Sequence, residues 1–241
     1  MLFLSIIFLF WVFKNNLFPK SESKMVQISN STVPSSLSSD TSNNSGDAQS
    51  VLQTDSKSDW QLVLVNLNNK KSEMNPKLVN IGNIQMDARI QKNVEDFFTA
   101  AKAVDPKVHL ISGYRSVEYQ SHLFSSYVQQ TMTENPSWTE AQATSEVMTY
   151  SQPSESSEHE TGLAMDMSTV DSLNQEDPNV ASQIAAIAPR YGFILRFPTW
   201  GQKSTGIEYE DWHFRYVGEA NAKYITDNHL TLEEFLDKLS K

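Results

Sequence analysis

The sequence predicts an α+β fold, in which a small antiparallel sheet is flanked by helices. Two observations lead to this expectation. Amphipathic helical segments cluster early in the folded region, and short strand-like runs cluster later. Strictly alternating strand and helix patterns would instead predict a parallel sheet, and the sequence does not show them. No internal repeat is visible in the sequence.

The composition excludes several kinds of site. The chain has 241 residues, a hydrophobic fraction of 39% and a net charge of −10. This length and composition suit one domain of ordinary size with a hydrophobic core. The acidic balance argues against nucleic acid as a partner, because phosphate contacts need basic patches. The chain contains no cysteine, which excludes disulfides, thiolate metal sites and cysteine nucleophiles.

The start of the chain predicts a membrane-associated segment followed by a linker. Residues 1–19 are almost purely apolar through Phe13, which fits an uncleaved membrane anchor or, alternatively, a cleaved signal segment. Residues 20–59 are rich in Ser, Thr and Asn and contain no aromatic residue. Such a segment buries too little apolar surface to fold, so we expect a disordered linker. The folded domain is expected over residues 60–241, as a monomer.

The first half of this domain is expected to contain one early strand and then mainly helices. The strand is expected over 60–69, and an amphipathic helix over 86–104. A short strand over 108–112 precedes a second helix capped by Ser116, and a capping box over 137–140 opens a third helix. The residues on the apolar face of the first helix are Ile90, Val94, Phe97, Ala101 and Val104.

The second half is expected to supply most of the sheet. Short strands are predicted over 163–168, 193–197 and 211–217. A short helix over 182–190 and a loop over 201–206 lie between them. The last helix is expected to begin after Thr231, which forms a capping box with Glu234.

The stretch SSEHETGLAMDMS places His159 in a loop and Asp166 inside an apolar strand. A charged group in such a strand must be paired or bound, because burying it alone is costly. Side chains alternate along the predicted strand 211–217, so its aromatic residues point to one side and His213 to the other. The aromatic residues can therefore face the core while His213 faces a cleft.

Two histidines and one aspartate are a complete three-ligand set for catalytic zinc, with a fourth position open for water. His159, Asp166 and His213 supply this set, and Glu210 is a nearby candidate for taking the proton from that water. Each residue also has a structural interpretation, as a surface histidine or a buried acid satisfied by its neighbours. We expect the flanking Glu158 and Glu160 to be solvated and outside the chemistry.

These motifs resemble those of the VanY-type D-alanyl-D-alanine carboxypeptidases. SEHETGLAMD fits the motif S-x-H-x-x-G-x-A-x-D, EDWHFRYVG fits E-x-W-H-x-R-Y-V-G, and SGYRS followed by Gln120 fits a third. The three occur in family order over roughly residues 86–241. The surrounding run TYSQPSESSEHETGLAMDMSTVDSLN is most similar to the streptococcal L,D-carboxypeptidase branch, whose members trim the terminal D-alanine from peptidoglycan stem tetrapeptides.

The resemblance implies a hedgehog/D,D-peptidase-like zinc domain and a role for each motif residue. The implied zinc (Zn2+) ligands are His159, Asp166 and His213, and the implied general base is Glu210. Arg115 and Gln120 are implied to hold the substrate.

Arg115 and two further residues, Ser157 and Trp212, can also be interpreted from their own chemistry. For Arg115 the chemistry agrees with the implied role, because a guanidinium offers a charge-assisted fork to a terminal carboxylate. Ser157 is expected either to bind that carboxylate or to stabilise a turn. Trp212 is expected either to line the site or to lie in the core.

The expected function is therefore zinc-dependent removal of the C-terminal D-alanine from peptidoglycan stem peptides, with L,D-cleavage of tetrapeptides favoured. D,D-cleavage of pentapeptides is the alternative, and a non-catalytic cell-wall-binding module of the same fold is a second. An endopeptidase is also conceivable, although anchoring of a terminal carboxylate by Arg115 argues against it. The expected location is outside the cytoplasm of a Gram-positive-type bacterium, at the membrane or in the cell wall, or secreted if the first segment is cleaved.

Overall fold

The computed structural model describes residues 56–239. The predicted anchor over 1–19 and nearly all of the predicted linker lie outside these residues. Within the described range, no helix is both long enough and apolar enough to cross a membrane.

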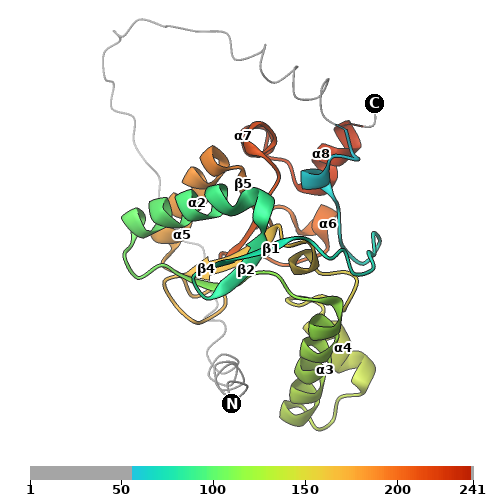
Figure 1. Ribbon diagram of the computed structural model, residues 1–241. Coiled ribbons are helices and arrows are strands. Elements are labelled where there is room, and N and C mark those ends of the chain that lie inside the picture. Colours follow the sequence, from blue (N-terminus) through green and yellow to red (C-terminus); the bar gives the residue numbers. More distant parts are fainter. Residues whose placement is uncertain (1–55, 240–241) are drawn as a thin grey trace, which may run out of the picture. The chain divides into compact units, whose positions relative to one another are not determined.

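A four-stranded antiparallel sheet runs through the domain, in the order β3-β4-β6-β5 (Figure 1). The strands are β3 (His109–Ser112), β4 (Ala164–Ser168), β5 (Phe193–Leu195) and β6 (His213–Tyr216). A separate antiparallel hairpin contains β1 (Leu78–Ile81) and β2 (Ile84–Asp87). The predicted α+β fold with a small antiparallel sheet is confirmed, and the hairpin is an addition that the sequence pattern did not reveal.

Helices cover the sheet and extend the domain. Two of them, α2 (Gln91–Val104) and α5 (Pro178–Ile187), lie next to each other across the domain (Figure 1). Near the end of the chain are α6 (Gln202–Thr205), α7 (Glu219–Asp227) and α8 (Leu232–Lys238). Short 3-10 turns complete the list: η2 (Trp60–Leu62), η3 (Ala88–Ile90), η4 (Glu158–Thr161) and η5 (Ala188–Tyr191).

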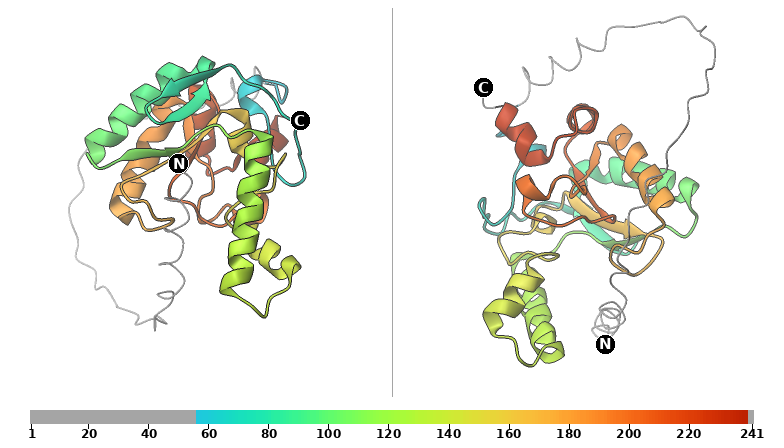
Figure 2. Two further views of the ribbon diagram at one scale, coloured as in Figure 1. Left: turned by 60° about the horizontal axis from the view of Figure 1, so that its bottom comes forward. Right: turned by 180° about the vertical axis from the view of Figure 1, so that it is seen from behind.

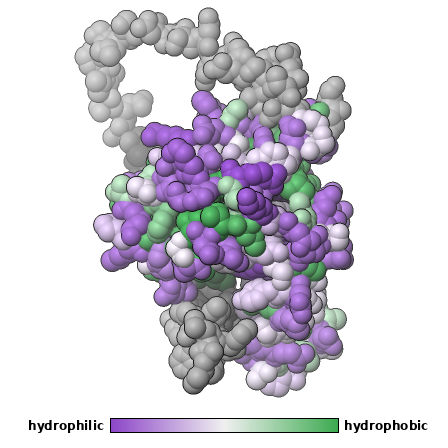
Figure 3. Space-filling model, viewed as in Figure 1, coloured by the Kyte–Doolittle hydropathy of each residue, from purple (hydrophilic) through white to green (hydrophobic). Residues whose placement is uncertain are grey.

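The helices α3 (Val117–Glu134) and α4 (Glu140–Val147) form a pair that projects away from the sheet (Figure 2). Val128, Ala143 and Val147 make a small buried cluster of their own between them. The surface of this pair is mostly polar on the face drawn in Figure 3. The main core and the pair are therefore separate packing units within the described part of the domain.

The main core lies between α2 and the sheet. Four of the five apolar residues predicted on one face of α2 or at its start are completely buried, namely Ile90, Val94, Phe97 and Ala101. The ring of Phe97 packs against Phe193 and Phe214, with centroid distances of 5.2 Å to each. Aromatic contacts from two neighbouring strands thus hold α2 on the sheet.

Truncation of Phe97 should destabilise the whole domain. We expect Phe97→Ala to lower the free energy of unfolding by about 3–5 kcal/mol, because the cavity it leaves is enclosed by helix and sheet. Phe98→Ala is a matched control, since Phe98 is only partly buried, and it should cost clearly less. Urea unfolding followed by circular dichroism measures both; equal losses would contradict the assigned core.

The prediction of a first strand over residues 60–69 is wrong. Residues 60–62 form the 3-10 turn η2, and the following residues run without a ladder partner until the isolated bridge between Asn66 and Asn69. The side chain of Arg215 takes the place of a neighbouring strand here, because its Nη2 donates to the carbonyl oxygens of Gln61 and Val63. A side chain brought from the other end of the sequence therefore replaces the expected strand pairing.

Several boundaries also differ from the predicted ones. The helix expected from residue 86 begins at Gln91, because Met86 belongs to β2. The capping box of α4 is formed by Thr139 and Gln142, two residues later than expected. Asp177 caps α5, so this helix starts earlier than predicted. The expected loop over 201–206 contains the short helix α6.

Candidate metal centre and active site

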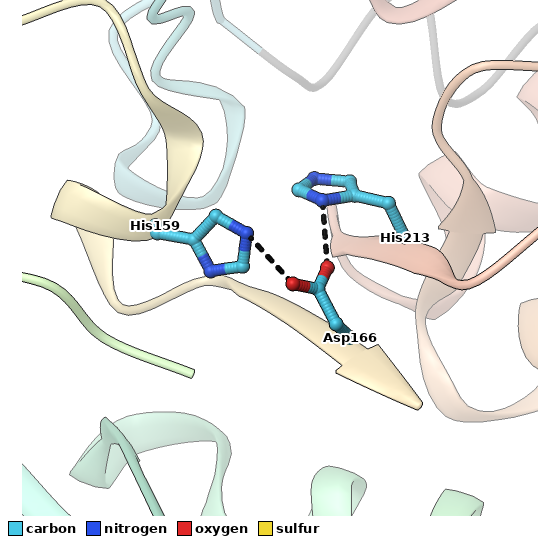
Figure 4. A group of neighbouring side chains, drawn as sticks. All are labelled: His159, Asp166 and His213. Atoms are coloured by element: carbon cyan, nitrogen blue, oxygen red, sulfur yellow. Dashed lines mark hydrogen bonds and ion pairs between the residues drawn. The ribbon is translucent and has the colours of Figure 1, made fainter. Parts of the chain in front are cut away.

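The strand register brings the candidate metal ligands together. Asp166 on β4 lies directly opposite His213 on β6 and opposite Ser112 on β3. His159 comes from the 3-10 turn η4 immediately before β4. The possible ligand atoms of His159, Asp166 and His213 all lie within 4.8 Å of one another (Figure 4). The three residues predicted from the motif therefore meet at one buried point of the sheet.

The two histidines approach opposite oxygens of one carboxylate. His213 Nδ1 lies 3.0 Å from Asp166 Oδ1, and His159 Nε2 lies 3.3 Å from Asp166 Oδ2. All three side chains are nearly inaccessible to solvent. Two nitrogens and one carboxylate oxygen are a donor set that zinc prefers.

His159 is held in this orientation from behind. Its Nδ1 lies 2.7 Å from the carbonyl oxygen of Gly113, which leaves Nε2 to face Asp166. Gly113 is required there because a Cβ atom would lie 2.4 Å from the carbonyl oxygen of Gln85. Ligand histidines characteristically use their second ring nitrogen in this way, because the bond fixes the ring. The residues present therefore fit a zinc ion.

Gly162 closes the turn that carries His159. It ends η4 with φ +70°, a left-handed conformation that other residues adopt at a cost. Its carbonyl oxygen accepts a hydrogen bond from the backbone N–H of Asp87, at 3.0 Å. The glycine thus allows the left-handed turn between His159 and Asp166.

The ligand set carries opposite charges in the metal-free protein. Burial disfavours a charge on His213, but Asp166 and Glu158 outweigh this and raise the pKa of His213 to about 9. Burial likewise works against the Asp166 carboxylate, but the neighbouring histidines hold the pKa of Asp166 well below its ordinary value. A cation that binds here must displace the proton on His213, so its affinity should fall as the pH falls.

Glu210 lies beside the ligands without joining them. Its Oε2 is 3.8 Å from His213 Nδ1, and the side chain is only 5% exposed. Its backbone N–H donates to the carbonyl oxygen of Phe197, which positions the turn before β6. Burial raises the pKa of Glu210 to about 8. A carboxyl group whose pKa lies near neutrality is suited to accept and return a proton.

Arg115 adds a positive group at the Oδ2 oxygen of Asp166. Its guanidinium donates to Ser112 Oγ, Gln120 Oε1 and Asp166 Oδ2, at 3.0, 3.2 and 3.3 Å. Its side chain keeps 18% of its surface exposed. Gln120 is completely buried, and its Nε2 donates to the carbonyl oxygen of Gln152. Gln120 therefore contacts Arg115 in this structure and fixes its orientation.

The two remaining predicted residues lie close to the ligands in sequence and are both buried. Ser157 immediately precedes η4, 5% exposed, and its carbonyl oxygen accepts from the N–H of Glu160. Trp212 immediately precedes His213 and is 6% exposed. Their assignment to substrate binding stays a prediction.

The expectation that Glu158 and Glu160 are solvated is wrong. Glu158 is 4% exposed and Glu160 is 2% exposed. Glu160 accepts from the backbone N–H of Glu155, and burial raises its pKa to about 7. Burial alone would raise the pKa of Glu158 as well, but the charges of Arg196 and Arg215 outweigh it and hold that pKa below its ordinary value.

Two buried arginines that contact Glu158 were not predicted from the sequence. Arg196 is 1% exposed and Arg215 is completely buried. One signal was available in the sequence, because Arg215 shares a strand face with His213. A fully buried arginine needs an acidic partner. Which glutamate supplies the charge could be learned only from the structure.

Comparison with known proteins identifies the family. The family model described as VanY, D-alanyl-D-alanine carboxypeptidase, matches residues 83–219, more than half of the chain. YodJ of Bacillus subtilis (strain 168), a carboxypeptidase by name, is 39% identical over 153 residues. A D-alanyl-D-alanine carboxypeptidase of Enterococcus faecalis (strain ATCC 700802 / V583) is 33% identical over 181 residues. These matches cover 61% and 74% of this chain, but only 52% and 66% of the two relatives.

Solved structures share the fold. VanYB in complex with D-alanine-D-alanine has a TM-score of 0.66 at 33% identity, covering 74% of this chain and 98% of that chain. A VanY variant in complex with Zn(II) has a TM-score of 0.64 at 34% identity, covering 73% and 99%. The LD-carboxypeptidase LdcB has a TM-score of 0.56 at 31% identity, covering 73% and 85%. With its three motifs assembled at one buried centre, the chain belongs to the VanY D-alanyl-D-alanine carboxypeptidase family.

Proposed function

We propose that this protein is a zinc-dependent carboxypeptidase that releases the C-terminal D-alanine from peptidoglycan stem peptides. The observation that carries the proposal is the buried set of His159, Asp166 and His213, with Glu210 beside it and a partly exposed Arg115 in contact with Asp166. The complex of the related VanYB with D-alanine-D-alanine and that of a VanY variant with Zn(II) support it.

Each residue has a distinct task in this reaction. A zinc ion held by His159, Asp166 and His213 would supply Lewis acidity, which makes water acidic enough to attack at neutral pH and polarises the scissile carbonyl. Glu210 accepts the proton of the attacking water and returns it to the amine of the departing D-alanine. Arg115, oriented by Gln120, binds the terminal carboxylate and so restricts cleavage to the last residue.

The bond that is cut distinguishes two versions of the proposal. The sequence around His159 resembles the L,D-carboxypeptidase branch and favours cleavage of tetrapeptides. The higher TM-score to VanYB than to LdcB favours D,D-cleavage of pentapeptides. Release of D-alanine by the purified protein from synthetic tetrapeptide and pentapeptide decides between them. An L,D-enzyme turns over the tetrapeptide faster, a D,D-enzyme turns over the pentapeptide faster, and release from neither contradicts the proposed activity.

Arg115→Lys should impair recognition of the terminal carboxylate. Lysine keeps the charge but loses the planar fork that matches a carboxylate, and the loss of a charged hydrogen bond corresponds to a drop in kcat/KM of roughly 100-fold. We expect most of the change in KM. The matched control is Arg89→Lys, whose half-exposed guanidinium pairs with Asp87, which is not one of the three ligands. Steady-state kinetics measures both variants.

A blocked substrate separates this role from a merely structural one. The wild type should strongly prefer a peptide with a free carboxylate over the same peptide with a C-terminal amide, and Arg115→Lys should lose most of that preference. If the amide were cleaved as fast as the acid by the wild type, the assignment as an exopeptidase would fail.

We also propose that the domain works outside the cytoplasm, where peptidoglycan lies, with residues 1–19 as its anchor or signal segment. The apolar composition of that segment supports the proposal. Protease added to protoplasts, whose membrane is intact but whose wall has been removed, tests this location. We expect the protease to degrade the domain, and a domain that stays protected until the protoplasts are lysed would contradict the proposal.

A further inference from the structure

The buried carboxylate of Glu158 faces the ring of His213, one of the candidate metal ligands. His213 presents Nδ1 to Asp166 Oδ1 at 3.0 Å, which leaves Nε2 as its second ring nitrogen. Glu158 Oε2 lies 3.5 Å from this Nε2. This distance is slightly longer than that of an ordinary hydrogen bond. Both atoms are buried, however, and neither has a hydrogen bond to any residue that the structure describes. Each is therefore the natural partner of the other.

Two arginines decide which oxygen of Glu158 faces His213. Its Oε1 accepts from Arg196 Nε at 2.9 Å and from Arg215 Nη1 at 2.8 Å. Because Oε1 is occupied by two charged donors, Oε2 is the oxygen left for the imidazole. Loss of the carboxylate would leave the buried guanidinium of Arg215 without its acidic partner, and that of Arg196 with Glu233 alone.

The arginines are themselves fixed by distant parts of the chain. Arg196 donates to both carboxylate oxygens of Glu233 on α8, at 2.9 and 2.6 Å. Arg215 donates to the carbonyl oxygens of Gln61 and Val63, at 3.0 and 2.7 Å. The first and last described segments of the domain therefore converge on Glu158.

The contact between Glu158 and His213 decides which nitrogen of the imidazole ring carries the proton. Neutral imidazole carries one N–H and one free lone pair, and the nitrogen that binds a metal must be the unprotonated one. A carboxylate facing Nε2 stabilises the tautomer with its proton on Nε2, which leaves the Nδ1 lone pair directed at Asp166 and the other ligand atoms. In His159 the two nitrogens have exchanged these tasks. The carbonyl oxygen of Gly113, 2.7 Å from Nδ1, stabilises the tautomer with its proton on Nδ1 and leaves the Nε2 lone pair for the metal.

We propose that Glu158 is a positioning residue for His213: its Oε2 accepts a hydrogen bond from Nε2–H, stabilises the tautomer in which Nδ1 is free to bind the metal, and holds the ring in place. This inference rests on the zinc site of the proposed function. It assigns to the buried network of Glu158, Arg196 and Arg215 a role in metal affinity in addition to any role in stability.

Zinc affinity of Glu158→Gln tests the assignment. The glutamine amide has nearly the same shape, and its oxygen can still accept from the arginines while its NH₂ donor replaces Oε2 against Nε2. We expect zinc binding 10- to 100-fold weaker than in the wild type. Glu233→Gln is the matched control, because it removes the same charge from Arg196 without placing a donor at His213, and it should stay within about threefold of the wild type. Competition between the purified protein and a chelator for zinc alone measures all three affinities.

Nuclear magnetic resonance of the ¹⁵N-histidine-labelled, zinc-loaded protein gives a second readout. The wild type should show His213 bound through Nδ1 and a slowly exchanging proton on Nε2, and Glu158→Gln should exchange that proton faster. Equal zinc affinities of Glu158→Gln and Glu233→Gln would overturn the inference. So would a wild type bound through Nε2, a result that does not depend on the variant folding. A wild type that binds no zinc would instead overturn the metal site of the proposed function itself.

Discussion

Replacement of Glu210 by glutamine is expected to lower kcat about 1000-fold, within the range of 10²- to 10⁴-fold typical for a general base. Glutamine keeps the shape of the side chain but accepts no proton from water at neutral pH. Zinc affinity should stay within a few-fold of the wild type, because Glu210 lies beside the ligand set as a neighbour 3.8 Å from His213 Nδ1. Single-turnover release of D-alanine and chelator competition measure the two quantities.

Stability provides an internal check on the same variant. The pKa of Glu210 in the folded protein is raised to about 8, above its ordinary value of 4.5. An acid with a raised pKa in the folded state costs stability once the pH exceeds its unfolded value. Glu210→Gln should therefore be at least as stable as the metal-free wild type at pH 7 and above. A loss of activity that merely followed a loss of stability would contradict the role as a base.

The matched control for Glu210→Gln is Glu208→Gln. Glu208 lies two residues earlier on the same segment and is exposed. We expect its kcat to equal that of the wild type. If Glu210→Gln retained wild-type turnover, the proposed mechanism would be wrong, whereas a drop in both variants would point to a general effect of the segment on folding.

Asp166→Asn should have the largest effect on the metal. Asp166 is the anionic member of the ligand set and contacts both histidines. We expect zinc affinity to fall more than 100-fold, beyond the loss typical of an outer partner of a ligand, and activity to fall to background. Zinc should raise the melting temperature of the wild type, since it binds the folded state, and should leave that of the variant unchanged at the same concentration.

The control for this prediction is Asp171→Asn. Asp171 follows β4 on the same segment, is 65% exposed and pairs with His109 at the surface. Its zinc affinity and activity should match the wild type. Unaltered zinc affinity in Asp166→Asn would place the metal elsewhere in the protein.

The sequence supplied the elements that depend on local pattern. The apolar face of α2, the strand β4 and the capping box of α8 all follow from periodicity or capping chemistry within a few residues, and all are confirmed. The strand expected over 60–69 failed for the opposite reason. Two of its backbone carbonyl groups, those of Gln61 and Val63, accept from Arg215, more than 150 residues away in the sequence, and no local pattern records such a contact.

The candidate site divides in the same way. The sequence by itself determined the candidates for zinc ligands and for a base, because donor chemistry and the motifs shared with the family belong to the residues themselves. Only the tertiary structure decided that Glu158 is buried against two arginines, that Gln120 supports Arg115, and which nitrogen of each histidine faces Asp166. These features depend on the register of antiparallel strands and on long-range pairing of buried charges, which are fixed only when the segments pack together.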